Sequence, residues 1–334
     1  MDLFRGKIFT MKTAARLAVS LVGLFATVSF LLADPPATSA PALPESVEVA
    51  SVKLGEGVYL LRGTTKNSNP STVIFIGPEG TVVVDPNMMS VGPAITREIE
   101  RLGGGPVRYV FCTHYHGDHA EGMQYFGPQA AIITPHHQRS RLMTQAVDGD
   151  KEMLPPSAWP VMTFEGTFTL HLNGAEVQVA TLPNLHGHTD GDAVIYFPAQ
   201  KVLCVGDYLF VDKFPIIDIA EGGGDLEGYL ANIRFLVAHF PADTQVVPGH
   251  GYFIPHPVEA VTMAKFAANL AALEKSIAEI RAHMTGGRTR EQVIADGLPV
   301  EFASYDVRPR FVPIAKWIGF VYDYYAAKSP ATKP

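Results

Sequence analysis

The segment 113–119, with the sequence THYHGDH, constrains what this chain can fold into more than any other feature. Three imidazoles and one carboxylate follow within six residues, directly after the apolar run VRYVFC, which is typical of a buried strand. His and Asp side chains at a strand end suit Zn²⁺ or Fe²⁺; a histidine-rich surface loop is the alternative. In an extended turn His114 and His116 point to one side while Asp118 and His119 diverge, which predicts two adjacent ions.

Three later residues stand at the same kind of position, the carboxyl end of an apolar strand. His188 lies in NLHGHTDGD after the run VQVATL, Asp207 ends KVLCVGD, and His250 lies in QVVPGHG. Taken singly, an Asp after Gly is more often a turn residue than a ligand, but the four sites together predict one metal centre. The predicted ligands are His114, His116, Asp118, His119, His188, Asp207 and His250.

Short β-type runs and helical segments alternate in the order β-rich, helical, β-rich, helical. Two hairpins are indicated, by a Pro-Glu-Gly turn at 78–80 and by an Asn-Gly turn at 173–174. Helices are predicted over 91–102, 226–240 and 257–283, and the region 151–160 is expected to form a loop over the metal centre. This order predicts an α+β protein with two mixed sheets packed face to face and helices outside.

The first 33 residues resemble a signal peptide, because Lys12 and Arg16 precede the uncharged run LAVSLVGLFATVSFLLA. Cleavage is expected after Ala33 or Ala40, with Met11 as an alternative start; a retained membrane anchor is the competing interpretation. Residues 34–46 are rich in Pro, Ala and Ser and are predicted to be a flexible lead-in. We therefore expect a periplasmic or secreted protein without a membrane contact, in which 47–334 form a single domain with a C-terminal helical extension.

Charge and cysteine content narrow the function further. Loss of residues 1–33 removes four basic residues and one acidic residue, which leaves 22 Lys and Arg against 32 Asp and Glu, a formal charge of −10. Such a chain is unsuited to a nucleic-acid backbone, which requires clustered Lys and Arg. Cys112 and Cys204 lie in apolar runs without CxxC spacing, so we expect two buried free thiols rather than a disulfide or metal ligands.

The order HxHxDH, GHT, GD and GHG, with these gaps, resembles the metallo-β-lactamase superfamily over about residues 47–254. The resemblance implies an αββα sandwich with the metal site at one edge. The implied cofactor is two Zn²⁺, with iron as the alternative, and the implied activity is hydrolysis of a small acyl substrate by a bridging hydroxide. The implied ligand sets are His114, His116 and His188 for one ion, Asp118, His119 and His250 for the other, and Asp207 for both.

Two positions depart from the commonest β-lactamases of this superfamily, which have Cys at the position of Asp207 and Arg at that of His119. The all-His/Asp set is similar to glyoxalase II and lactonases, whereas the GHT run and the leader resemble the β-lactamases. Persulfide dioxygenases share HxHxDH and an HTDG run but use a single iron. A β-lactam, a lactone or another ester is therefore the expected substrate. The alternatives are a glyoxalase II-like thioesterase, an iron persulfide dioxygenase and a non-catalytic member.

Residues beside the predicted ligands are candidates for the chemistry and for outer contacts. Asp118 is expected to orient the nucleophile or carry its proton as well as to bind metal. Thr189 and Asp190 are expected either to fix imidazole tautomers or to cap a turn. His186, two residues before His188, is a further candidate for an outer contact.

Substrate contacts are expected from aromatic and basic side chains near the ligands. Tyr115, Tyr208 and Phe210 either line the pocket or pack in the core. Lys213 either meets a substrate carboxylate or is a solvated surface residue, and the second interpretation is favoured. Farther away, His136 and His137 are expected to face solvent, and the aromatic run 317–325 to cover the core or to form a dimer contact.

Overall fold

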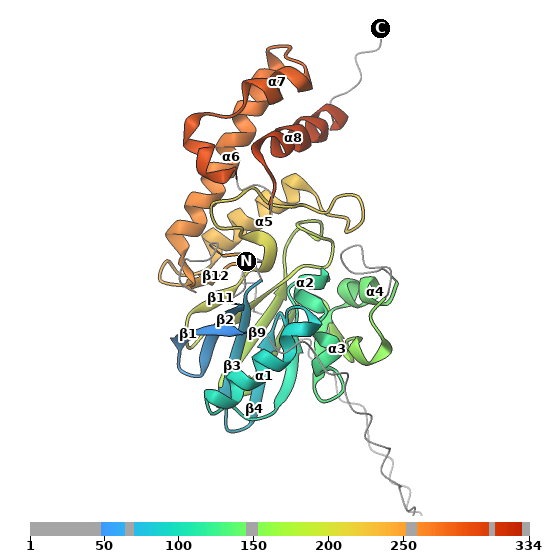
Figure 1. Cartoon of the computed structure of the whole chain (residues 1–334), viewed down its shortest axis with the longest axis vertical. Coiled ribbons are helices and arrows are strands. Elements are labelled where there is room, and N and C mark those ends of the chain that lie inside the picture. Colours follow the sequence, from blue (N-terminus) through green and yellow to red (C-terminus); the bar gives the residue numbers. More distant parts are fainter. Residues whose placement is uncertain (1–47, 64–69, 145–152, 252–258, 307–310, 329–334) are drawn as a thin grey trace, which may run out of the picture.

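The computed structural model describes residues 48–63, 70–144, 153–251, 259–306 and 311–328, so the predicted leader and lead-in lie outside the described residues. Two mixed β-sheets pack face to face, and helices lie on their outer sides (Figure 1). This arrangement confirms the predicted α+β sandwich. No described helix combines the length and the apolarity that crossing a membrane requires.

The first sheet has seven strands in the order β1-β2-β3-β4-β5-β6-β7. Its first four strands pair antiparallel, and β4 to β7 pair parallel. The strands are β1 (Val49–Gly55), β2 (Val58–Gly63), β3 (Thr72–Gly77), β4 (Gly80–Val84), β5 (Val107–Phe111), β6 (Ala131–Pro135) and β7 (Met162–Phe164). The predicted hairpin at 78–80 joins β3 to β4, with Gly77 paired to Gly80.

The second sheet has six strands in the order β13-β12-β11-β10-β9-β8. Only β11 and β12 pair parallel in it. The strands are β8 (Thr167–Leu172), β9 (Ala175–Thr181), β10 (Ala193–Phe197), β11 (Val202–Cys204), β12 (Gln245–Val247) and β13 (Val261–Thr262). The Asn-Gly turn joins β8 to β9 as expected, with Asn173 and Gly174 both at positive φ.

Neighbouring residues of the central strands enter different cores, because successive side chains of a strand face opposite sides. Leu60, Val73 and Val82 pack between the two sheets, whereas their neighbours Ile74 and Val83 pack outward against helices. Both faces of the central strands are therefore covered, which explains why these strands read as continuous apolar runs, whereas the edge strand β8 alternates exposed and half-buried residues.

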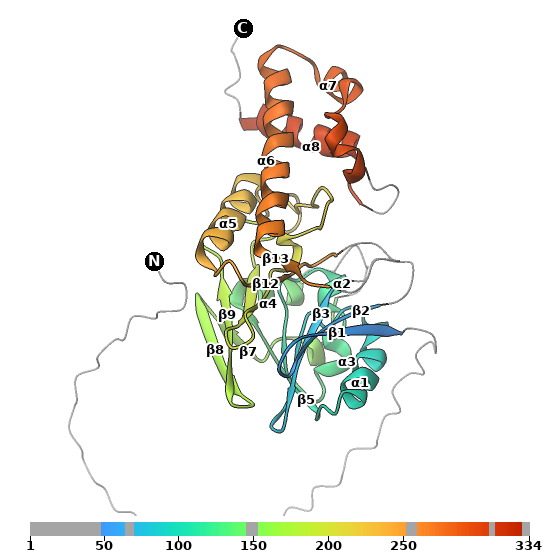
Figure 2. The same cartoon turned by 90° about the vertical axis from the view of Figure 1, so that its left-hand side faces the viewer.

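The helices form an outer layer on each sheet and a lobe beyond the sandwich. Figure 2 shows α1 and α3 outside the first sheet and α5 beside the second. The helices are α1 (Gly92–Arg101), α2 (Gly117–Ala120), α3 (Met123–Phe126), α4 (His136–Thr144), α5 (Leu226–His239), α6 (Met263–Thr285), α7 (Arg290–Asp296) and α8 (Ile314–Lys328), with short 3-10 turns η1 (Met89–Val91), η2 (Pro156–Ala158), η3 (Gly206–Tyr208) and η4 (Val300–Tyr305).

The lobe consists of α6, α7 and α8 and shares one apolar core with the outer face of the second sheet. Trp317 on α8 is fully buried, stacks on Phe214 with ring centroids 5.0 Å apart, and donates to Ser276 Oγ on α6. α7 begins with a capping box formed by Thr289 and Gln292. The buried side of the aromatic run 317–325 thus covers the core; its role in a dimer stays a prediction.

Two predictions about loops and helices need correction. The helix predicted from residue 257 begins at Met263, because Val261 pairs with Val246 as an edge strand and the Thr262 side chain accepts from Lys265 N as N-cap. The region 151–160 does not lie over the metal centre in its described part, 153–160. Its η2 turn packs against α3 instead, and Trp159 Nε1 donates to Leu154 O.

Candidate metal centre

The first motif delivers its ligands from a strand end and from the helix that follows. β5 ends at Phe111, His116 is extended as N-cap of α2, and α2 carries Asp118 and His119 in its first turn. The bend at Gly117 therefore sends His114 and His116 to one side and Asp118 and His119 to the other. This is the divergence that the pattern predicts.

The other predicted ligands come from loops that follow strands of the second sheet, and glycines let these loops approach. Gly206 has a φ of +53°, and a Cβ there would lie 2.4 Å from Thr113 Oγ1. A Cβ at Gly249 would lie 2.1 Å from Asp207 Oδ1. A side chain at either glycine would therefore collide with the residues around it, so glycine allows the GD and GHG runs to lie close to each other and to the first motif.

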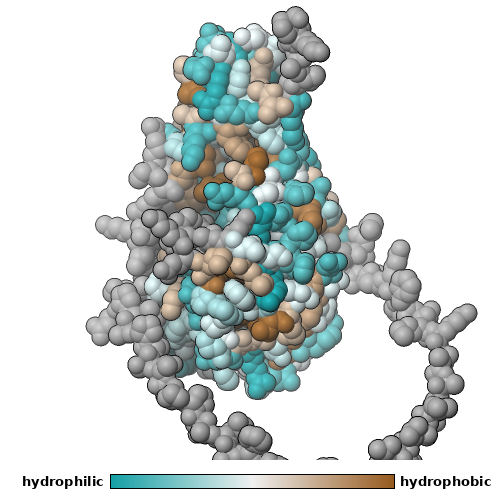
Figure 3. All heavy atoms as spheres, turned by 90° about the vertical axis from the view of Figure 1, so that its right-hand side faces the viewer, coloured by the Kyte–Doolittle hydropathy of each residue, from teal (hydrophilic) through white to brown (hydrophobic). Residues whose placement is uncertain are grey.

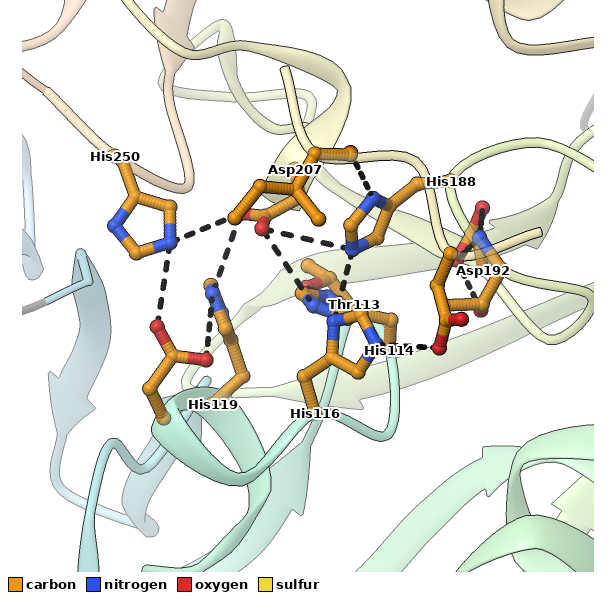
Figure 4. Close-up of polar contacts among 12 residues, drawn as sticks. Thr113, His114, His116, His119, His188, Asp192, Asp207 and His250 are labelled. Carbon is orange, nitrogen blue, oxygen red and sulfur yellow. Dashed lines mark hydrogen bonds and ion pairs between the residues drawn. The ribbon is translucent and has the colours of Figure 1, made fainter. Parts of the chain in front are cut away.

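The seven predicted ligands form two groups whose nitrogen and oxygen atoms lie within 4.8 Å of one another (Figure 4). The groups are His114, His116, His188 and Asp207, and Asp118, His119 and His250. The structure thus brings all seven together, from segments separated by more than a hundred residues. Their roles as ligands stay a prediction at the level of single residues.

Asp207 lies between the two groups. Its Oδ2 is 3.6 Å from His188 Nε2 and 3.8 Å from His114 Nε2. Its Oδ1 is 3.3 Å from His119 Nε2 and 3.5 Å from His250 Nε2. One carboxylate oxygen therefore faces each group, which is the geometry of a bridging ligand.

Several nitrogen and oxygen atoms of the predicted ligands lack a hydrogen bond, and this shows whether the residues present fit metal ions. His114 Nε2, His119 Nε2 and Asp207 Oδ1 are buried without a hydrogen-bond partner among the described residues. Buried polar atoms are rarely left this way unless an ion or water satisfies them. Imidazole nitrogens and carboxylate oxygens are also the donors that Zn²⁺ takes. The residues present therefore fit metal ions.

A hydrogen bond on the other ring nitrogen orients four of the five imidazoles. His119 Nδ1 lies 2.9 Å from Asp85 Oδ2, and His188 Nδ1 lies 2.9 Å from Ile216 O. His114 Nδ1 is 3.1 Å from Thr113 Oγ1. Such outer partners fix the tautomer and direct the free nitrogen toward a metal.

His116 is turned the other way round. Its Nδ1 faces His188 Nε2 at 3.0 Å, and its Nε2 lies 3.1 Å from Asp218 Oδ2. Asp218 also accepts a 2.8 Å hydrogen bond from the Tyr115 hydroxyl. Asp218 therefore orients His116 through the nitrogen that points away from the group.

Sequence reasoning missed both carboxylates of this outer layer, Asp85 and Asp218. Asp85 directly follows the apolar strand β4, which is the same kind of position that identified the predicted ligands, so the sequence did contain a signal for it. It adopts a φ of 52°, and its carboxylate accepts from both the amide and the hydroxyl of Thr113. This strained backbone is the kind that persists where the surroundings determine it strongly. Asp218 has no comparable signal, because it lies in the loop between η3 and α5.

Burial and neighbouring carboxylates separate the protonation of the two groups. Burial lowers the pKa of His188 to about 4 and that of His114 well below its usual value. Burial also lowers that of His250, but Asp207 and Asp118 outweigh it and raise the pKa to about 9. For Asp118 burial acts upward, yet His119 and His250 bring the pKa down to about 2. His114 and His188 thus offer neutral imidazoles, whereas the second group would release protons on binding metal.

A model of the Metallo-beta-lactamase superfamily matches residues 66–250, more than half of the chain. The chain belongs to this superfamily. Relatives include the hydroxyacylglutathione hydrolases of Brucella ovis and Brucella canis, each 32% identical over 201 residues, with 57% of this chain and 65% of the relative covered. The chain therefore spans just under two thirds of the length of these relatives.

Solved structures of the superfamily share the fold. A metallo-β-lactamase from Pontibacter korlensis matches with a TM-score of 0.54 and 20% identity, covering 67% of this chain and 98% of that one. The DIM-1 metallo-β-lactamase matches with a TM-score of 0.53 and 18% identity, covering 68% and 97%. At these identities the likeness concerns the fold alone. Members of the superfamily bind metal ions, and the His/Asp cluster of this member is built to do so.

A cavity of about 1190 Å³ opens over the two groups. Asp118 and Asp207 lie at its floor with His116, His188 and His250. The loop between η3 and α5 forms one side, and α8 forms another. One helix of the C-terminal lobe, α8, therefore lines the cavity beside the His/Asp cluster, which the sequence did not indicate.

The expectation favoured for Lys213, a solvated surface position, is wrong. Lys213 is 2% exposed, its Nζ donates to Gly251 O, and it lies 4.9 Å from the centroid of the Phe311 ring. Burial, with Arg62 nearby, lowers the pKa of Lys213 to about 7. The side chain lies beside Gly251, the residue after His250, and it is not among the described residues that line the cavity.

The other candidate contacts fall into two kinds. Tyr208 packs in the core, with its hydroxyl 2.7 Å from Asp192 Oδ2, and Phe210 stacks on His250 at 5.1 Å between centroids. Tyr115 reaches Asp218, as described above. All three side chains are buried and none is among the described residues that line the cavity, so the core-packing interpretation holds for them; Tyr115 and Phe210 also contact residues of the centre.

The contacts of the GHTDGD segment favour turn formation. The amide and hydroxyl of Thr189 both donate to Asp192, and Asp190 pairs with Arg141 at 2.8 Å. His186 is exposed, with Nδ1 2.7 Å from Gly223 O, and so orients the loop rather than His188.

The solvent exposure expected for His136 and His137, the two histidines that begin α4, is confirmed. Cys112 and Cys204 are buried free thiols as predicted.

Proposed function

We propose that this superfamily member is a dinuclear zinc hydrolase that cleaves a small acyl substrate. The observation that carries the proposal is the position of Asp207, with one oxygen toward each group of ligands. A single-ion site would need only one of these groups. The open cavity directly above them gives a small molecule access.

The seven residues divide the work of holding the ions as the resemblance implies. His114, His116 and His188 would hold one ion, Asp118, His119 and His250 the other, and Asp207 both. Bound there, zinc supplies a water of lowered pKa at neutral pH and polarises the carbonyl that is attacked. The donor set contains no cysteine, which agrees with a centre of hard and borderline ligands.

Asp118 is the residue that we propose to act in the chemistry beyond binding metal. Its side chain is 31% exposed toward the cavity, whereas His119 is fully buried, and its Oδ2 lies 3.3 Å from His250 Nε2. A carboxylate so placed, which its lowered pKa keeps ionised, can orient the attacking water. Asp85, Asp218 and Thr113 keep the imidazoles in place while this happens.

A second candidate is hydrolysis of a thioester. The relatives at 32% identity are named hydroxyacylglutathione hydrolases. The similarity of the all-His/Asp ligand set to that of glyoxalase II supports the same class of substrate. We further propose that the chain works in the periplasm or outside the cell, on a small molecule and not on nucleic acid. The acidic composition and the leader-like run at the N-terminus support this part of the proposal.

The test begins with the metal content of the purified protein. We expect about two zinc ions per chain and chelator-sensitive hydrolysis of at least one compound from a panel containing a chromogenic cephalosporin, a lactone, a p-nitrophenyl ester and a glutathione thioester. Asp118→Ala should abolish turnover with the fold intact by circular dichroism. Asp243→Ala, which changes an exposed carboxylate paired with Lys201, is the matched control.

Two outcomes would overturn the proposal. One iron per chain with oxygen uptake on a persulfide would replace the hydrolase by an oxygenase. Full activity of Asp118→Ala would remove the role given to this carboxylate.

A further inference from the structure

Large apolar side chains line two sides of the cavity above the predicted ligands. Ile216, Ile217 and Ile219 come from the loop between η3 and α5, and Phe311 and Phe320 face them from the segment before α8 and from α8 itself. We call these five residues the apolar wall. Ile216 is 48% exposed and Ile219 is 39% exposed, although both are large aliphatic residues. Apolar surface that is left open beside a predicted reaction centre indicates a binding surface.

The face drawn in Figure 3 shows apolar surface gathered where the C-terminal lobe meets the sandwich. The lobe reaches this position because α8 packs its buried side, with Trp317 and Val321, against α6 and Phe214. Phe320 and Tyr324 lie on the side of α8 that lines the cavity, four residues apart and so on one helix face. One side of α8 is therefore buried in the core, and the other presents Phe320 to the cavity together with polar residues.

The charged residues around the wall are mostly acidic. Four carboxylates line the cavity, Asp218, Glu221, Asp225 and Asp323, and we call them the acidic rim; Lys328 is the one Lys or Arg among the described lining residues. Lys328 already donates to Asp225 Oδ2 at 3.1 Å, and Asp323 accepts from Arg290. The hydrogen bonds that Asp225 accepts from Gly228, Tyr324 and Lys328 outweigh burial and lower its pKa, so Asp225 is a carboxylate at neutral pH.

We propose that the substrate is an uncharged ester or lactone with an apolar acyl group of several carbons, which the apolar wall binds while the acidic rim repels acyl groups that end in a carboxylate. The proposal rests on the hydrolase function proposed above and names its substrate class. It makes β-lactams and glutathione thioesters poorer substrates, because both carry carboxylates that would face the acidic rim.

The experiment compares three p-nitrophenyl esters that share a leaving group: the acetate, the hexanoate and the adipate monoester. In each, water adds its hydroxyl to the acyl carbon, the bond to p-nitrophenolate breaks, and a proton goes to solvent. Hexanoate and adipate monoester have the same chain length and differ in the terminal carboxylate. With the zinc-loaded full chain, we expect kcat/KM for hexanoate to exceed both others by at least about tenfold, since each buried methylene contributes about 0.8 kcal/mol.

Ile219→Lys places a cation in the apolar wall, and Val300→Lys is the matched control because Val300 is 89% exposed and is not a lining residue. Ile219→Lys should raise kcat/KM for the adipate monoester by about fivefold and lower that for hexanoate, since a nearby opposite charge favours a carboxylate. Val300→Lys should change neither value. Equal rates for hexanoate and adipate monoester, or no response to Ile219→Lys, would overturn the substrate class and leave the hydrolase standing. Absence of chelator-sensitive turnover of these esters and of the whole panel would instead overturn the hydrolase function, and the substrate class with it.

Discussion

Two regions face the same cavity and are built in different ways: the seven predicted ligands at its floor and the apolar wall above them. The ligands lie on the loops and the short helix that follow strands, and in four imidazoles the ring nitrogen that faces away from the predicted metal position makes a hydrogen bond that fixes the orientation of the ring. The apolar wall consists of residues of a loop, Phe311 and one side of α8, and two of its residues, Ile216 and Ile219, are exposed to solvent in part. The floor is held by directional bonds, whereas the wall is held mainly by packing behind it.

This difference assigns the chemical step to the residues of the floor and the choice of substrate to the residues of the wall. Changing a residue of the floor removes a charge or a ligand from a buried cluster, which has a large effect because nothing nearby can replace it. Changing one residue of the wall removes only part of the apolar area that contacts the substrate, because the other apolar side chains remain, and the effect is therefore smaller. Asp218 connects the two regions, since its loop carries three isoleucines of the wall and its carboxylate holds His116.

The largest effect is expected at Asp207. In Asp207→Ala, metal content should fall below two ions per chain and kcat/KM should drop by roughly 1000-fold, since several kcal/mol of charge stabilisation are lost. Metal analysis and steady-state kinetics check this. Retention of two ions per chain at normal activity would show that the two groups bind metal without a bridging carboxylate.

A smaller effect is expected at Asp218, which orients His116 without belonging to either group. Asp218→Asn should lower metal affinity or kcat about 10- to 100-fold, the range seen when outer partners of metal-bound histidines are changed. The ratio of hexanoate to acetate turnover should not change, because the isoleucines stay in place. Glu176→Gln, at an exposed position on β9, is the control. A changed chain-length ratio at normal metal affinity would assign Asp218 to the wall instead.

The buried Lys213 predicts a pH dependence of stability. Its pKa is lowered from 10.5 to about 7 in the folded chain. Between these values the unfolded chain holds a proton that the folded chain lacks, so folding stability rises with pH in this window. Relative to Lys213→Met, the wild type should gain about 2 kcal/mol from pH 7 to pH 10, below the limit of about 1.4 kcal/mol per pH unit. Denaturant unfolding of both proteins at a series of pH values measures this; parallel curves would contradict a neutral Lys213.

The smallest effect is expected where α8 is tied to the start of α5. Tyr324 donates to Asp225 Oδ2 at 2.7 Å across 99 residues of sequence. Tyr324→Phe should destabilise the protein by about 1 kcal/mol, the usual net value of one hydrogen bond, and raise KM about threefold without changing kcat. Tyr322→Phe is the matched control, because its hydroxyl bonds to Arg288 O away from the cavity. An equal rise in KM in both variants would show that α8 does not set substrate affinity.

Several elements could be predicted because their signals are local. The two hairpins follow from their turn residues, and α1 and α5 match the predicted helices to within about two residues. The helix expected from 257 was too long at its start, since the pairing of Val261 with Val246 depends on a strand fifteen residues earlier. The surface position given to Lys213 failed because composition alone favours exposure of lysine.

The sequence by itself determined the donor chemistry of the centre and the strands that carry it, because a ligand motif and an apolar run are each read within a few residues. Only the tertiary structure decided what surrounds that centre. Tyr115 meets Asp218 across 103 residues, and α8 joins the cavity through the packing of Trp317 on Phe214. Such contacts arise from how whole elements bury their apolar faces against one another, and no short stretch of sequence contains that information.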